Sequence, residues 1–103
     1  MINPDKYLKY LAETDEPCAK AKSLMKSLEH ALKTVEATEF LRSDGTQEAK
    51  KSSARASQAY RDMIDKIHEA TLDYETMNNK RKTAEMCIEV FRSQNANMRK
   101  GNI

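Results

Sequence analysis

Tryptophan is absent from this chain of 103 residues, glycine and proline occur only twice each, and no apolar run approaches the ~20 residues of a membrane span. Leu, Ile, Val and Phe contribute only 16 residues, an inventory that accompanies disorder when the net charge is also high. The formal net charge is only +2, however, and Ala, Glu, Lys, Leu and Arg supply 47 residues, close to the proportion typical of long helices. These counts argue against a membrane-spanning or disordered chain and predict a soluble, all-α, coiled-coil protein.

Cysteine is also scarce. Cys18 and Cys87 lie 69 positions apart and lack the CxxC or Cys/His spacing of a metal or redox site. The first six residues contain no apolar segment of the kind found in a secretory signal. Because thiols stay reduced in the cytosol, we expect two free, buried cysteines in a cytoplasmic protein.

Helix start and stop signals divide the chain. Pro4 fits a helix start, because proline at the first helical position gives up a donor that has no partner there. The acidic residues before Pro17 fit a second start, with Thr14 or Asp15 as the cap. Gly45 lies in the strongest interior turn signal. We therefore predict a single helical domain with helices over about 4–13, 16–42 and 47–99 and a turn at 43–46.

The third predicted helix carries a heptad pattern. Steps of four and three residues from Ala49 to Met98 pass through fifteen positions, of which twelve are apolar or aromatic. A sustained repeat of 3.5 residues keeps one seam on a partner helix, so it predicts a helical hairpin or antiparallel coiled coil with a short N-terminal helix and a long C-terminal helix. The polar exceptions are of the kind that set register or oligomeric state: Ser53, Arg81 and Asn95. The sequence leaves two alternatives at Asn78 and Asn79, a continuous helix or a break, because asparagine competes for backbone hydrogen bonds.

The predicted helices differ in length. Pairing across a turn at Gly45 brings the second helix only as far as Tyr74, which leaves an apolar stripe on the order of 35 Å without a partner. Either the short first helix covers part of this stripe or a second copy of the chain does. We expect a homodimer, with higher even states open, that associates through Met77, Ala84, Ile88, Phe91 and Met98.

Motifs for chemistry are missing. His30 and His68 are isolated imidazoles, and a metal site between helices would need ligands repeated on the facing helix. No serine or cysteine lies in a nucleophile motif, and no glycine-rich loop is present to bind phosphate. The sequence therefore predicts no enzyme, no catalytic residue, no cofactor and no metal, and a minimal metal protein is a remote third possibility.

Charge is distributed unevenly. Residues 1–77 carry a net charge of −2, whereas residues 78–103 carry +4. Basic side chains along an exposed helix can follow a nucleic-acid backbone or bind an acidic partner. A basic last turn also simply complements the helix dipole. If the segment binds a partner, the expected contacts are Lys80, Lys82, Arg92, Arg99 and Lys100.

Residues 79–85 and 90–101 form an arginine-rich helix that ends in an aromatic-Arg-Ser-x-x-Ala-Asn-x-Arg pattern. This segment, a quarter of the chain, resembles small uncharacterised helical proteins of tailed bacteriophages that belong to early, recombination-type regions. Many of those proteins have Trp where this chain has Phe91. The resemblance implies an accessory role in phage DNA metabolism in the host cytoplasm and transfers no catalytic residue.

Two functions fit these features. A coiled-coil assembly or adaptor protein explains the heptads and the length mismatch. A nucleic-acid-binding accessory factor in phage recombination or replication explains the basic segment. Salt distinguishes them, because phosphate contacts weaken steeply as salt rises, whereas association through an apolar seam does not.

Overall fold

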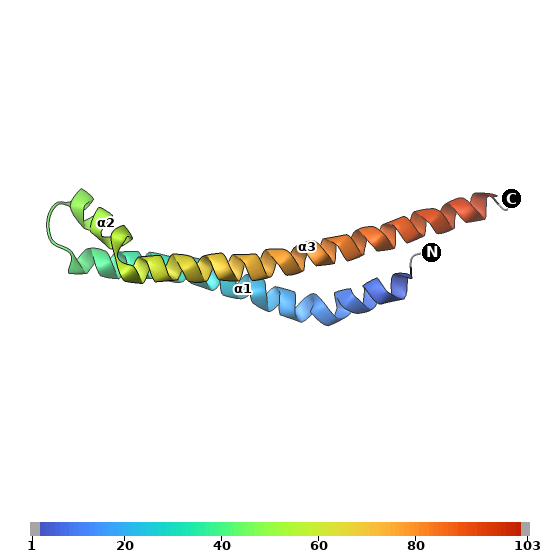
Figure 1. The fold of residues 1–103 in the computed structure, drawn as a ribbon, viewed down its shortest axis with the longest axis horizontal. Helices are drawn as coiled ribbons and strands as arrows, with labels where there is room; N and C mark the ends of the chain where they lie inside the picture. The colour runs from blue at the N-terminus through green and yellow to red at the C-terminus, as the bar shows by residue number, and fades with distance from the viewer. Residues whose placement is uncertain (1–2, 102–103) are drawn as a thin grey trace. The chain divides into compact units, whose positions relative to one another are not determined.

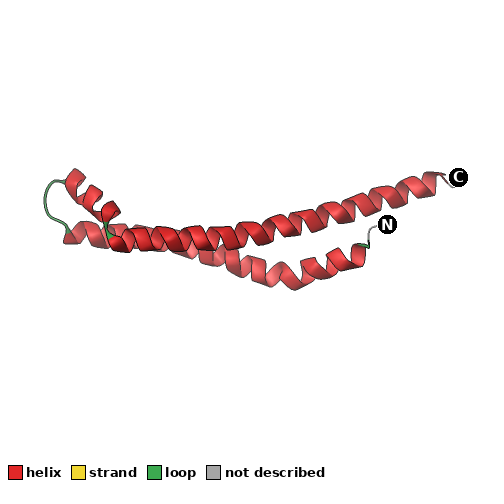
Figure 2. Cartoon of the chain, in the orientation of Figure 1, coloured by secondary structure: helices red, strands yellow, loops and turns green. Residues whose placement is uncertain are grey.

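The structure, a computed structural model, describes residues 3–101 and contains three helices: α1 (Pro4–Arg42), α2 (Gln47–Ala56) and α3 (Gln58–Gly101) (Figures 1 and 2). No strand occurs in residues 3–101, and the predicted all-α helical hairpin is confirmed. The chain divides into two compact units. The terminal unit joins the start of α1, up to residue 19, to α3 from residue 75 onward, and the central unit spans residues 20–74.

α1 is one helix, so the predicted break at residues 14–16 is wrong. Pro17 lies inside it and is exposed. A proline in a helix interior costs about 3 kcal/mol, because it removes one backbone hydrogen bond. The apolar spacing continues on both sides of Pro17, so an uninterrupted helix buries one face and offsets that cost. The buried or half-buried positions of this face are Tyr7, Leu11, Thr14, Cys18, Ala21, Met25, Leu28, Leu32 and Val35.

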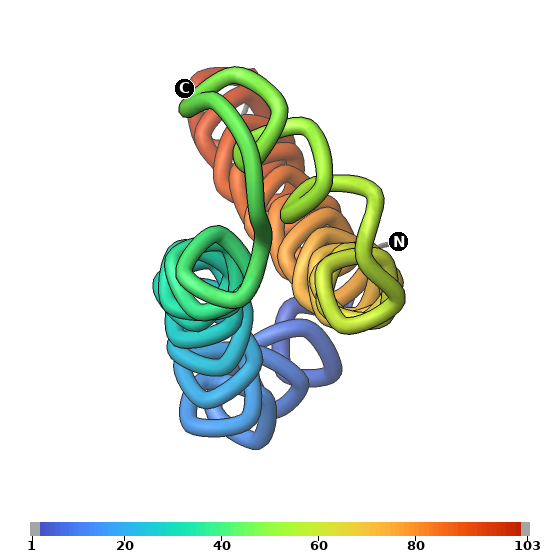
Figure 3. The backbone as a smooth tube through the Cα atoms, turned by 90° about the vertical axis from the view of Figure 1, so that its left-hand side faces the viewer, coloured from blue at the N-terminus to red at the C-terminus, as the bar shows by residue number. Residues whose placement is uncertain are grey.

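The turn between α1 and α2 occupies residues 43–46, as the sequence suggests. Gly45 has a φ of +111°, a conformation that residues with a Cβ rarely adopt. Thr46 caps α2, and its hydroxyl accepts a hydrogen bond of 3.1 Å from the backbone N–H of Ala49. Figure 3 shows the chain leaving the end of α1 at this turn and returning through α2 to the start of α3.

A single helix over 47–99 was expected, and the structure instead separates α2 from α3 at Ser57. Its backbone is extended, with ψ at 152°, and its hydroxyl accepts from the N–H of Tyr60 (3.2 Å) and donates to the carbonyl of Ala54 (2.6 Å). Serine side chains compete in this way with helical hydrogen bonds. The break shifts the buried face of α2 from the expected Ala49, Ser53 and Ala56, which are exposed, to Lys50 and Ala54. No break occurs at Asn78 and Asn79, which lie inside α3.

The central unit has a thin core. Ala54 and Ala70 are its fully buried apolar residues, at 0% and 5% exposure. Larger seam residues of α3 are half-buried: Tyr60, Met63, Ile67 and Tyr74. An ion pair of 3.0 Å between Arg55 of α2 and Glu36 of α1 crosses the surface of this unit. Small side chains at the closest positions let the helices pack without a globular core, which is consistent with the low apolar content.

Candidate functional site: the C-terminal part of α3

The first turns of α1 pack along α3 in the terminal unit. Leu8 and Leu11 line one hollow with Ile88, and Tyr7 and Tyr10 line another with Ala84. This packing leaves Ala84 only 2% and Ile88 8% exposed. Four of the five expected association residues are therefore covered at least in part within the same chain: Ala84 and Ile88 are buried, and Met77 and Phe91 are half-buried. The expected uncovered stripe is shorter than the sequence suggested, because Pro17 does not end α1.

Arg81 joins the two helices of this unit. Its guanidinium donates hydrogen bonds of 2.7 Å to the backbone carbonyl of Leu11 and to the hydroxyl of Thr14, and it lies 3.4 Å from a carboxylate oxygen of Asp15. The Arg81 side chain is 17% exposed, whereas that of Asp15 is 84% exposed. The ion pair is therefore screened by water, and the two neutral acceptors hold the side chain in the seam. The heptad spacing predicted Arg81 to be a polar residue of the seam, and the structure places its side chain there.

A tyrosine and a cysteine interact across the same seam. A hydrogen bond to Cys87, together with the negative charge that Cys87 carries when ionised and some loss of solvation, raises the pKa of Tyr7. Cys87 is half-buried, Cys18 is buried, and both thiols are free. Cys18 thus fits the expectation of a buried thiol, and Cys87 does so only in part.

The five predicted contact residues are all exposed, but they do not share one face. Lys80 lines the hollow that also contains Lys6 and the two tyrosines of α1. Arg92 lines the other hollow, on the opposite side of the seam, and its guanidinium donates a 2.8 Å hydrogen bond to Glu89. The structure thus brings Lys80 to Lys6, a pairing that the sequence did not indicate. The remaining exposed basic residues of the set are Lys82, Arg99 and Lys100.

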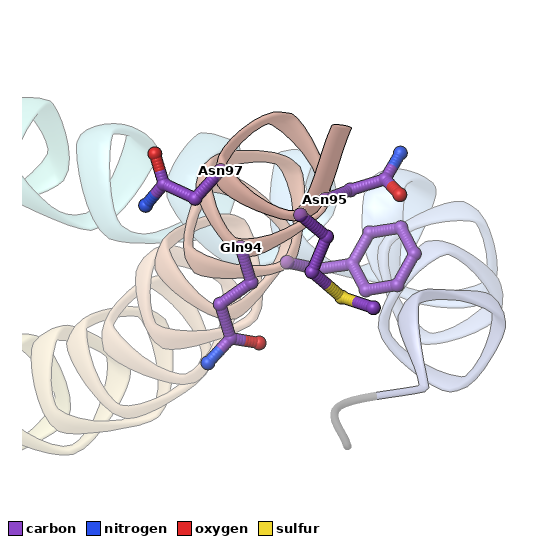
Figure 4. A pocket seen from close by; sticks show the side chains of 5 residues that line it. Gln94, Asn95 and Asn97 are labelled. Carbon is purple, nitrogen blue, oxygen red and sulfur yellow. The ribbon is translucent and has the colours of Figure 1, made fainter. Parts of the chain in front are cut away.

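α3 continues past the start of α1 (Figure 1). Residues 92–101 are helical and exposed throughout. Phe91 is half-buried, and Met98, the next apolar seam residue, is 55% exposed. With three amide side chains these two residues line a further hollow, and Figure 4 shows Asn95 and Asn97 projecting to opposite sides of the helix. Seam positions of this last segment therefore have no helix of the described chain against them. We call residues 92–101 the overhang.

No group of three or more His, Cys, Asp and Glu side chains that could hold a metal ion lies within residues 3–101. Across the same residues, none of the helices combines the length and apolar character needed to traverse a bilayer. Comparison with protein-family models, with curated proteins and with solved structures gives no match for this chain.

Proposed function

We propose that this chain is a helical assembly or adaptor module that associates with a second copy of itself through the C-terminal part of α3. The overhang is the observation that supports this proposal most strongly. The overhang is the end of the 44-residue α3 and has no helix of residues 3–101 packed on it, whereas most helical stability in proteins comes from such packing. The overhang therefore gains stability when another helix packs on it, and a second copy supplies such a helix. The role is binding rather than catalysis.

Apolar exposure supports the same conclusion. Met86, Val90 and Met98 are 67%, 45% and 55% exposed on α3 of the terminal unit. On α3 of the central unit Leu72 is 67% exposed as well, whereas the seam residues Tyr60 and Ile67 are half-buried. Exposed apolar side chains that recur along one helix are typical of a surface that binds another protein.

The test is the solution mass of the full chain as a function of concentration. Sedimentation equilibrium from about 1 to about 100 µM should show the mass rising from 11.8 kDa toward that of a dimer. A chain that ends at Arg92 lacks the overhang, so it should dimerise more weakly than the full chain and keep its circular dichroism per residue. A full-length chain that stays monomeric over the whole range contradicts the proposal.

The alternative is a nucleic-acid-binding accessory factor of phage DNA metabolism. It is supported by Lys6 and Lys80 beside two tyrosines in one hollow, by Arg99 and Lys100 exposed at the end of α3, and by the resemblance of residues 79–101. Lysines can contact phosphates while tyrosines stack on bases.

A mobility-shift titration with single- and double-stranded oligonucleotides tests this alternative. About four phosphate contacts per chain would give a log–log salt slope of roughly −3 to −4 on duplex. Changing Arg99 and Lys100 together to Gln should reduce the slope by about two. No shift at tens of micromolar protein, or a shift that the double variant reproduces in full, would contradict nucleic-acid binding through this segment. Self-association would then be the remaining proposal.

A further inference from the structure

One face of α3 in the terminal unit carries no charge between Thr76 and Ser93, and Thr83 is its one residue that lines either hollow shared with α1. Its positions are spaced alternately three and four residues apart, and every one is exposed: Thr76, Asn79, Thr83, Met86, Val90 and Ser93. We call this set the outer stripe. Alternating steps of three and four are the spacing of a helix-packing seam, and here they lie on the side opposite the seam that α1 already occupies.

Other outward faces of the same helices look different. In the terminal unit the equivalent outer positions of α1 are Lys9, Glu13 and Glu16, and Lys9 pairs with Glu13 at 3.8 Å. Earlier in α3 the equivalent positions include Asp65 and Glu69. Charged residues on the outer face are what a solvated coiled-coil helix requires. The outer stripe lacks them over 18 residues, about 27 Å of helix, which is long enough for a packing surface.

We propose that the outer stripe packs against the outer stripe of a second copy, with the two α3 helices antiparallel. This inference rests on the proposed self-association and names its surface. The charge along α3 selects the antiparallel sense. Residues 58–77 carry a net charge of −3 and residues 78–101 carry +4. Antiparallel packing places the basic end of each helix beside the acidic part of the other, whereas parallel packing places like charges together.

The register follows from the symmetry of the stripe. A two-fold axis midway between Thr83 and Met86 sets each of them opposite the other in the second copy. The same axis places Asn79 opposite Val90. In this arrangement the overhang of each copy gains the other copy's α3 as a neighbour, which is what the proposed function requires.

Complementary charges flank the stripe in this register. Lys82 of each copy lies opposite Glu89 of the other, so the two-fold axis generates two such pairs. Lys82 forms no ion pair within residues 3–101. Glu89 is 66% exposed and accepts from Arg92 with one oxygen, so its carboxylate retains acceptor capacity for a lysine of the second copy.

Charge reversal in the full-length chain tests the arrangement. Lys82→Glu alone and Glu89→Lys alone each create two like-charge contacts, so the dimer Kd from sedimentation equilibrium should rise at least about tenfold. Lys82→Glu combined with Glu89→Lys restores both pairs, and its Kd should return to within about threefold of the wild type. Lys51→Glu on α2 is the matched control, because it makes the same change in net charge at an exposed site away from the stripe.

The outcomes separate this inference from the proposed function. If the wild type dimerises but the single reversals leave its Kd unchanged, the outer-stripe arrangement is wrong and self-association stands. The same holds if the double variant does not recover the wild-type Kd. Disruption by Lys80→Glu with rescue by adding Glu75→Lys would indicate a parallel pair and also overturns the inference. A wild type that never dimerises contradicts both the outer-stripe arrangement and the proposed self-association.

Discussion

The central and terminal units use the same two helices and differ in what those helices leave uncovered. In the central unit α1, α2 and α3 lie together, and the outer positions of α3 carry charges such as Asp65 and Glu69. In the terminal unit α3 extends past the start of α1, and its outer positions from Thr76 to Ser93 are neutral. Under the proposed function, the binding surface arises where α3 is longer than the part of α1 packed against it and presents a neutral outer face.

The largest expected effect distinguishes the inner seam of the terminal unit from its outer stripe. Ile88→Asp places a charge at a position 8% exposed, and this should cost about 3 kcal/mol or more of folding free energy. Val90→Asp introduces the same charge two residues away, at 45% exposure, and should leave stability within about 1 kcal/mol while it abolishes dimerisation. Thermal denaturation at fixed low concentration measures the first effect, and sedimentation measures the second.

Equal loss of stability in the two variants would show that both faces of α3 are buried to the same degree, against the assignment of an inner seam and an outer stripe.

A smaller effect tests how the terminal unit is joined. Arg81→Met keeps an unbranched stem that can still pack in the seam but removes the hydrogen bonds to Leu11 and Thr14, and the free energy of unfolding in urea should fall by about 1–2 kcal/mol. Arg92→Met removes an exposed ion pair to Glu89 on the same helix and should change stability by less than about 0.5 kcal/mol. If Arg92→Met is the more destabilising of the two, Arg81 does not hold the helices together.

The smallest effect concerns alkaline pH. The raised pKa of Tyr7 means that folding favours the neutral hydroxyl, so this contribution to stability is present below the usual tyrosine pKa of about 10 and is lost as pH rises through the higher value. Cys87→Ala removes the main cause of the raised pKa, so in an absorbance titration the tyrosinate of Tyr7 should appear at lower pH in Cys87→Ala than in the wild type. A titration curve that Cys87→Ala leaves unchanged would mean that Cys87 is not the cause.

The periodic parts of this fold could be predicted from the sequence. The heptad positions from Tyr60 to Phe91 are buried or half-buried as expected, and the turn lies at Gly45. The continuity of α1 was missed, although the signal was present: Leu11 and Thr14 continue the spacing of the Cys18 stripe through Pro17. A proline lowers the local preference for helix, and here the burial of a continuous face outweighs it.

The break at Ser57 and the arrangement of the basic residues were harder to foresee. Most residues just before Ser57 are of the same small types, so the sequence does not mark Ser57 as the end of a helix. Only its hydrogen bonds to Ala54 and Tyr60 distinguish it. The separation of Lys80 from Arg92 follows from helical geometry and was available in the sequence. The approach of Lys6 to Lys80 was not, because it depends on α1 passing through Pro17 without ending.

Mixing two charge-reversal variants tests the antiparallel dimer of α3 helices. The Lys82→Glu variant and the Glu89→Lys variant should each sediment near the monomer mass of 11.8 kDa at a concentration where the wild type is dimeric. In an equimolar mixture every facing pair is again of opposite sign, so the account predicts recovery of twice that mass. A mixture that stays at the monomer mass would contradict an antiparallel dimer built on α3.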